Sequence, residues 1–205
     1  MTQQALLAQG IAEMGLLVDG PKQEKLLTYM ALLQKWNKVY NLTAIRDAEE
    51  MVRLHLLDSL SVLPYVQGKN LLDVGSGGGL PGIVLAIVRP DLQVTTIDTV
   101  QKKAIFMRQV KGELGLGNLM VVHDRVENFQ PETKFDMIIS RAFSELGLFI
   151  QLTRHLIAPR GRWLAMKGQV PADELAKIDK KSNEIIELKV PGLDAERHLI
   201  VFEEA

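Results

Sequence analysis

The stretch LLDVGSGGGLPG, residues 71–82, joins an apolar run containing Asp73 to five glycines that lie within residues 75–82. A short apolar run bounded by glycines is typical of a buried strand. Glycines directly after a strand allow the backbone to approach a ligand closely, because they carry no Cβ atom. The stretch therefore predicts a strand, a ligand-binding loop and the start of a helix.

Strand-like and helix-like segments alternate after this stretch. Helical patterns begin near Gly82 and recur over residues 100–114, around 125–129 and over 146–157. Strand-like runs separate them, at residues 70–74, 93–98, 119–124, 135–140 and 161–166. Alternation at this spacing predicts a mostly parallel sheet with helices on both faces.

The two ends of the chain depart from this alternation. Residues 183–190 and 197–204 have the pattern of two strands joined by the turn PGLDAE, so the last strand should run antiparallel to its neighbour. Residues 1–66 show only helical patterns, among them a helix that begins at a capping residue, Asp47. We therefore expect an α/β core, residues 67–205, with an N-terminal helical extension.

Composition excludes several classes of protein. The 205 residues include no cysteine, so disulfides, thiolate metal sites and cysteine nucleophiles are excluded, and we predict no metal site. The apolar stretches are shorter than the ~18 residues of a membrane span, and the N-terminus lacks a basic leader. We expect a soluble cytoplasmic protein that does not bind membranes. Its formal net charge is −1, so contact with nucleic acid would need a local basic surface.

An acidic residue accompanies the glycine loop. Asp98 ends the second strand-like run, 23 residues beyond Gly75, where a carboxylate can accept hydrogen bonds from both ribose hydroxyls of a nucleoside. Dinucleotides are one class of ligand bound by a glycine loop together with such a carboxylate. Residues 77–82 satisfy the G-x-G-x-x-G pattern of dinucleotide-binding loops. However, Pro81 lacks the amide N–H with which a helix start would hold a pyrophosphate.

The second ligand class is S-adenosylmethionine, which carries no phosphate. Class I methyltransferases begin with an acidic residue and G-x-G-x-G, matched here by Asp73, Gly75, Gly77 and Gly79. An antiparallel last strand on a parallel sheet is also characteristic of these enzymes. We therefore favour a class I S-adenosylmethionine-dependent methyltransferase, a Rossmann-like α/β fold, over an NAD(P)-dependent oxidoreductase.

The residues present narrow the chemistry of the methyl acceptor. Methylation of cytosine C5 requires a cysteine thiolate, which the chain lacks. Residues 140–143, SRAF, do not form the Asn/Asp-Pro-Pro-aromatic motif used for exocyclic amino groups. Guanine N7 has a lone pair and no proton to lose, so its methylation depends on orientation rather than on a base. We assign no catalytic acid or base.

Basic residues follow or end several strands at the expected ligand edge of the sheet. If they converge there, a polyanionic substrate such as nucleic acid is indicated. Arg46, Arg53 and His55 of the extension are further candidates for the same face. The five residues at the strand ends are Arg125, Arg141, Lys167, Arg197 and His198.

Longer segments of the chain resemble one family, the bacterial guanine-N7 methyltransferases of small-subunit ribosomal RNA, also called the glucose-inhibited division protein B family. The resemblance implies methyl transfer from S-adenosylmethionine to N7 of a guanine, position 527 in the 530 loop of 16S ribosomal RNA. It therefore implies 16S ribosomal RNA, the small subunit or an assembly intermediate as partner. The segments are KWNKVYNLTAIRD (35–47), HLLDSL (55–60), DVGSGGGLPGI (73–83), RVENF (125–129), FDMIISRAF (135–143), MKGQ (166–169) and DAERHLIV (194–201).

The resemblance also implies a set of cofactor contacts. We add Gly77 because it belongs to the glycine pattern, and Asp98 because it ends the second strand, where it can accept from the ribose hydroxyls. The implied contacts are Gly75, Leu80, Val126, Glu127 and Arg141. One departure is Gly78, where the family commonly has proline or alanine, so the free loop should be more mobile. Methylation of another RNA or of a small molecule, and a non-catalytic RNA-binding module, remain alternatives.

Overall fold

A computed structural model of the chain describes residues 1–141, 143, 145–178 and 183–204. A seven-stranded sheet has the order β3-β2-β1-β4-β5-β7-β6. Strands β1 to β5 are parallel, whereas β7 is antiparallel to both β5 and β6. The parallel core and the antiparallel hairpin expected from the sequence are thus confirmed. The strands are β1 Asn70–Val74, β2 Gln93–Asp98, β3 Leu119–His123, β4 Phe135–Ser140, β5 Ile157–Lys167, β6 Asn183–Glu187 and β7 His198–Glu203.

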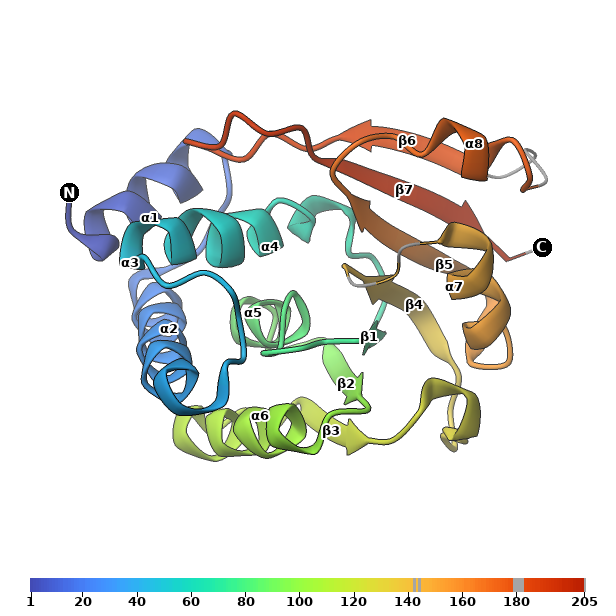
Figure 1. Ribbon diagram of the computed structural model, residues 1–205, viewed down its shortest axis with the longest axis horizontal. Coiled ribbons are helices and arrows are strands. Elements are labelled where there is room, and N and C mark those ends of the chain that lie inside the picture. Colours follow the sequence, from blue (N-terminus) through green and yellow to red (C-terminus); the bar gives the residue numbers. More distant parts are fainter. Residues whose placement is uncertain (142, 144, 179–182, 205) are drawn as a thin grey trace.

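Helices cover both faces of this sheet, as the continuous apolar strands require. The extension helices together with α5 and α6 share one apolar cluster with the first face, and α7 and α8 pack with the second. Figure 1 shows the extension on one side of the molecule and α7 and α8 on the other. The helices are α1 Gln3–Glu13, α2 Gly20–Tyr40, α3 Ala48–Met51, α4 Asp58–Leu60, α5 Gly82–Val88, α6 Gln101–Leu114, α7 Leu146–Thr153 and α8 Ala172–Leu175.

The extension ends in an irregular helix. The Asp47 side chain accepts hydrogen bonds from the amides of Glu49 and Glu50, which confirms the expected cap. Helix α3 then continues into a π-helical segment, Val52–Leu57, before α4. A π-helical turn holds more residues than an α-helical one and is frequent at functional sites.

The segment 146–157 corrects one expectation from the sequence. The predicted helix ends at Thr153, whose carbonyl accepts a hydrogen bond from the Leu156 amide. Ile157 already pairs with Phe135 as the first residue of β5. The apolar residues of segment 146–157 therefore belong first to helix α7 and then to strand β5. Helical periodicity alone does not show where the helix ends and the strand begins.

The extension also contacts the glycine loop directly. Tyr29, on α2, is fully buried, and its hydroxyl donates a hydrogen bond of 2.7 Å to the carbonyl oxygen of Gly78. Burial raises the pKa of this phenol, so Tyr29 remains a neutral donor. The loop at the carboxyl end of β1 is therefore held from the extension as well as from the sheet.

Candidate active site

Three adjoining cavities lie where the carboxyl ends of the parallel strands meet, the usual ligand edge of an open α/β sheet. We call them the Asp98 cavity (about 320 Å³), the glycine-loop cavity (about 230 Å³) and the arginine cavity (about 420 Å³). Gly75 lines both of the first two. Arg141 and His55 line both the second and the third. The glycine-loop cavity therefore lies between the other two and shares lining residues with each of them.

The Asp98 cavity combines an apolar wall with a fixed carboxylate. Ile97, Val126 and Phe143 contribute apolar side chains, while Asp98 and Glu127 contribute acidic groups. This composition suits a nucleoside, whose base is flat and apolar on its faces and whose ribose presents hydroxyl donors.

Asp98 itself is held in place by backbone amides. Its Oδ2 accepts a hydrogen bond from the amide of Gly77, and its Oδ1 accepts one from the amide of Val100, both at 2.9 Å. The Nζ of Lys103 lies 3.8 Å from Oδ2. Each carboxylate oxygen has two lone pairs, so both oxygens retain acceptor capacity for a ligand.

The glycine loop leaves space where side chains would otherwise lie. Gly75, Gly77 and Gly79 all have positive φ angles, of 69°, 59° and 98°. A Cβ atom built on Gly77 would meet no described protein atom within 4 Å, so this position faces open space. The loop is thus shaped to admit the methionine part of S-adenosylmethionine, and the residues present fit this cofactor.

The amides of the same loop argue against a dinucleotide. Six N–H groups, from residues 75, 76, 77, 79, 80 and 82, already donate to protein oxygen atoms. Pro81 has no N–H group. Since a pyrophosphate is normally held by free amides at this position, the loop offers few donors to such a ligand.

Asp73 lies beneath the loop and has no contact with solvent. Its Oδ2 accepts a hydrogen bond of 2.8 Å from the amide of Gly82, whereas its Oδ1 has no partner among the described residues. Burial raises the pKa of Asp73 to about 7. The carboxyl group therefore fixes the start of α5 through the amide of Gly82. Its burial raises the free energy of the ionised form, because that form loses its hydration.

Every residue predicted to contact the cofactor lines the first two cavities. Asp98, Val126 and Glu127 line the Asp98 cavity, and Gly77, Leu80 and Arg141 line the glycine-loop cavity, with Gly75 common to both. Their roles as ligand contacts stay predictions. Of the residues whose side chains the structure describes, no cluster of three or more His, Asp or Glu could hold a metal ion.

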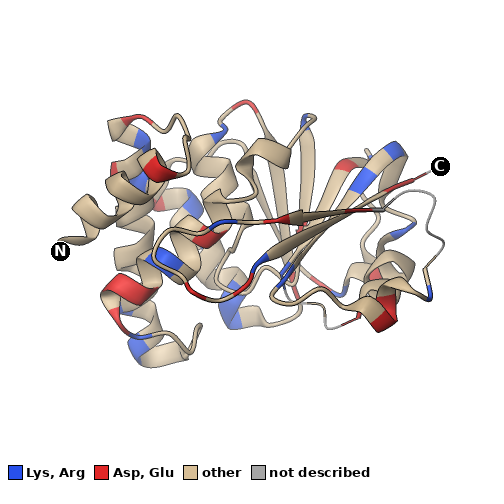
Figure 2. Cartoon of the chain, turned by 90° about the horizontal axis from the view of Figure 1, so that it is seen from above, with Lys and Arg blue, Asp and Glu red and all other residues tan. Residues whose placement is uncertain are grey.

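The arginine cavity gathers four of the five basic residues expected at this edge. Arg141, Lys167, Arg197 and His198 line it, together with apolar residues such as Leu54 and Met166. The Nζ of Lys167 donates to the carbonyl oxygen of Phe143 at 2.9 Å, and the Nδ1 of His198 donates to that of Gly168 at 2.6 Å. Among the described residues of the lining, Asp58 is the one carboxylate, so basic groups outnumber acidic ones there. Over the whole chain the two signs are nearly balanced, as the mixed blue and red segments of Figure 2 show.

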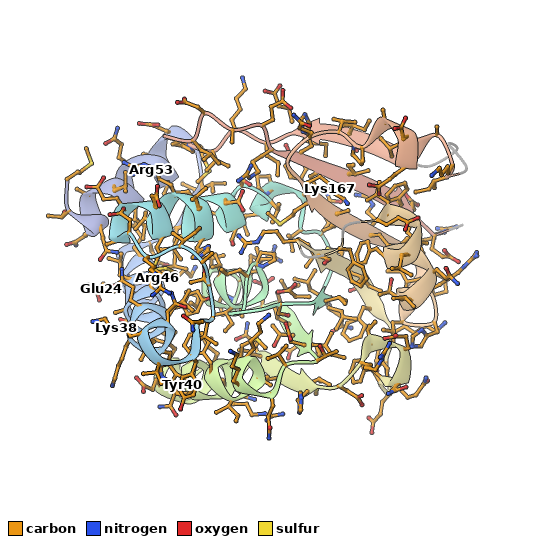
Figure 3. All side chains as sticks on the ribbon, viewed as in Figure 1. Glu24, Lys38, Tyr40, Arg46, Arg53 and Lys167 are labelled. Carbon is orange, nitrogen blue, oxygen red and sulfur yellow. The ribbon has the colours of Figure 1, made fainter. Side chains whose placement is uncertain are left out.

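Arg125 does not line the arginine cavity, so the structure brings together only four of the five basic groups in one cavity, and a role for Arg125 beside the cofactor stays a prediction. Arg125 follows β3, which three strands separate from β5. Its side chain is 70% exposed and forms an ion pair of 2.7 Å with Glu127, beside the Asp98 cavity. The Arg46 side chain donates to Asn41, on the extension. Figure 3 shows Arg46 and Arg53 apart from Lys167.

His55 enters the site as a neutral group. Its Nδ1 lies 3.1 Å from the carbonyl oxygen of Leu54, which can only accept, so this nitrogen carries the proton. Its Nε2 then accepts from the hydroxyl of Thr43 at 2.9 Å. Burial, with a contribution from the nearby Arg141, lowers the pKa of His55 to about 4.

Sequence reasoning missed Asp58, which joins two of the predicted basic residues. Asp58 has a side chain only 3% exposed, and its Oδ2 accepts from Nη1 of Arg141 at 3.2 Å. Its Oδ1 accepts from Nε of Arg197 at 3.0 Å. The available signal was a lone carboxylate within the apolar run HLLDSL, since such a charge is rarely buried without a partner.

Comparison with known proteins identifies the family to which this chain is similar. The family model described as rRNA small subunit methyltransferase G matches residues 22–200. The chain is 65% identical to ribosomal RNA small subunit methyltransferase G of Methylobacillus flagellatus, over 96% of each chain. It is 57% identical to the protein of that name from Aromatoleum aromaticum, over 97% of this chain and 98% of the relative.

A solved structure shows the same fold. The crystal structure of a SAM-dependent methyltransferase from Aquifex aeolicus superposes with a TM-score of 0.60 over 80% of this chain and 97% of that one. The two sequences are only 17% identical. The class I methyltransferase fold expected from the sequence is thereby confirmed.

Proposed function

The chain belongs to the rRNA small subunit methyltransferase G family, and we propose that it transfers a methyl group from S-adenosylmethionine to N7 of guanine 527 in the 530 loop of 16S ribosomal RNA. The observation that carries this proposal is the adjacency of the cofactor cavities and the basic arginine cavity, with Arg141 common to both sides. A methyl donor on one side and a polyanion on the other would meet at this residue.

The first two cavities supply the groups that hold the cofactor. Asp98 is placed to accept from the ribose hydroxyls, Val126 and Phe143 to contact the adenine, and Leu80 to contact the methionine part. When bound, S-adenosylmethionine supplies an electrophilic methyl group on a positively charged sulfur. The apolar wall and the glycine loop would hold the cofactor beside the arginine cavity, which shares Arg141 with the glycine-loop cavity.

The arginine cavity is suited to position a guanosine of a folded RNA. Its volume of about 420 Å³ lies in the range of small-molecule pockets, and a target base must leave its stack to enter such a pocket. Arg141, Lys167 and Arg197 can donate hydrogen bonds to phosphates or to the guanine O6, and His198 lies beside them. Guanine N7 attacks with its own lone pair, so the site needs orientation and not a general base, in keeping with a His55 that is already neutral and hydrogen-bonded.

The substrate and the cellular location follow from the same proposal. The natural partner is 16S ribosomal RNA, within the small subunit or an assembly intermediate, so the protein acts in the cytoplasm. No helix in the described part of the chain has the length and apolarity to span a membrane. The alternative of an NAD(P)-dependent oxidoreductase is less well supported, because the loop amides are already bonded within the protein.

The proposal is tested by incubating the protein with methyl-labelled S-adenosylmethionine and small ribosomal subunits that lack the modification. We expect one label per subunit, located at N7 of a guanine in the 530 loop when the RNA is digested and mapped. Label at another nucleotide would refute the position. Cofactor binding without any labelled RNA, whether naked or within subunits, would refute the substrate.

A further inference from the structure

Asp58 occupies an unusual place for a carboxylate. It begins α4, directly after the π-helical segment Val52–Leu57, and its side chain is 3% exposed. Its two charged partners arrive from distant parts of the chain, since Arg141 follows β4 and Arg197 precedes β7. One carboxylate of the extension thus joins two strand ends of the core.

Stability alone does not explain this arrangement. A buried ion pair contributes little net stability, because desolvating the charges offsets most of their attraction. The two guanidinium groups that line the arginine cavity carry the same charge and would repel each other. The Asp58 carboxylate, placed between them, offsets that repulsion and fixes one nitrogen atom of each group.

The two arginines depend on Asp58 to different degrees. Arg141 Nη1 has a second acceptor on the extension, the carbonyl oxygen of Leu54, at 3.0 Å. The other described bond of Arg197 is made by Nη1 to the carbonyl of its own neighbour, Glu196, at 2.8 Å. That bond does not tie Arg197 to another element, so the orientation of Arg197 toward the cavity rests on Asp58.

We propose that Asp58 is a positioning residue for the RNA substrate: its carboxylate holds Arg197, and to a smaller degree Arg141, in the orientation that receives the target nucleotide. This inference rests on the proposed function, because it names what orients the RNA-binding groups of that site. Orienting the guanidinium before RNA arrives lowers the side-chain ordering cost that binding would otherwise incur.

The first test is Asp58→Asn, which keeps the size of the side chain and removes its charge. We expect kcat/KM for unmethylated subunits to fall about 10- to 100-fold, as for loss of a hydrogen bond between charged groups. The dissociation constant of S-adenosylhomocysteine should change by less than about threefold, because Arg141 keeps its bond to Leu54. A loss confined to cofactor affinity would overturn the proposal.

A matched control is Asp136→Asn. The Asp136 carboxylate also joins elements, accepting from the amides of Lys69 and Asn70 at 2.7 and 3.0 Å, but it lies at the opposite end of β4 from Arg141. This variant should lose stability without losing kcat/KM for RNA. An equal loss of kcat/KM in both variants would mean that Asp58 acts only through general stability.

A double-mutant cycle separates positioning from an independent effect. Arg197→Ala alone should lower kcat/KM, and adding Asp58→Asn to it should cost far less than Asp58→Asn costs in the wild type. Losses that multiply independently would overturn the proposal that Asp58 acts through Arg197.

Nuclear magnetic resonance of the free protein keeps the proposal falsifiable if Asp58→Asn does not fold. The Nε–H signal of Arg197, assigned by its absence in Arg197→Ala, should show a heteronuclear NOE close to that of the backbone in the wild type. A mobile Nε–H group would overturn the proposal. Because no RNA is present, this result stands apart from the labelling experiment that tests the methylation itself.

Discussion

The Asp98 carboxylate has partners inside the protein and is expected to bind the cofactor, so Asp98→Ala removes both sets of bonds. Its oxygens hold the amides of Gly77 and Val100, each at 2.9 Å, and should also accept from the two ribose hydroxyls. Because the loop loses its anchor while the ribose loses its acceptor, we count a net loss of at least one charged hydrogen bond, about 1.5–3 kcal/mol. The dissociation constant should therefore rise about 10- to 150-fold.

The assay is calorimetric titration with S-adenosylhomocysteine, paired with urea unfolding of each variant. Asp98→Asn keeps one acceptor and the shape of the side chain, so its affinity should lie between those of the wild type and Asp98→Ala. Asp91→Ala is the control, since that carboxylate is 65% exposed and pairs with Arg89 outside the site. A folded Asp98→Ala protein that binds within about threefold of the wild type would refute the assignment of Asp98 to the ribose.

Four further predictions concern the RNA site, the loop and the pH dependence of stability. Arg197→Ala should lower kcat/KM for RNA at least about tenfold and leave S-adenosylhomocysteine affinity unchanged. Arg154→Ala, whose side chain is 70% exposed and pairs with Glu204 rather than with a cavity residue, should alter neither. Gly82→Ala would place a Cβ 2.7 Å from Oδ2 of Asp73, so urea unfolding should show a loss of about 1–3 kcal/mol. Burial raises the pKa of Asp73 from 3.8 to about 7, so the stability of the wild type relative to Asp73→Asn should be greatest below pH 3.8 and be lost as pH rises from 3.8 to 7. Burial lowers the pKa of His55 from 6.5 to about 4. The free energy of unfolding of the wild type relative to His55→Gln should therefore be greatest above pH 6.5 and decrease as pH falls from 6.5 toward 4. Urea unfolding at several pH values measures both differences.

The sheet and the loop were predictable because their signals are local. Strands β2, β3 and β4 are short apolar runs that end in a polar residue, and the glycines and Asp98 mark the ligand edge by their position along the chain. Helical periodicity does not reveal an additional residue within a turn, so the π-helical segment Val52–Leu57 could not be found in this way. The same limitation explains why the helix after β4 was predicted to extend beyond Thr153.

The basic site was only partly predictable, because its assembly depends on strand order and on distant partners. Arg125 and Lys167 both follow or end a strand, but the order of the strands brings only Lys167 to the arginine cavity. Asp58 binds residues 83 and 139 positions away. Nothing near Asp58 in the sequence indicates which cations neutralise it, so this contact required the three-dimensional structure.

The single apolar cluster shared by the extension and the sheet affects how the nascent chain folds. Helices α1 and α2 are completed before α5 and α6, against which the extension packs. At about 5–20 residues per second, ribosomal synthesis from residue 66 to residue 114, the end of α6, lasts about 2–10 s. During this interval the apolar stripe of α2 lacks its final partner and is open to association with other chains or to binding by chaperones. Translation speed over residues 67–114 should therefore influence the yield of folded protein more strongly than translation speed over the last strands.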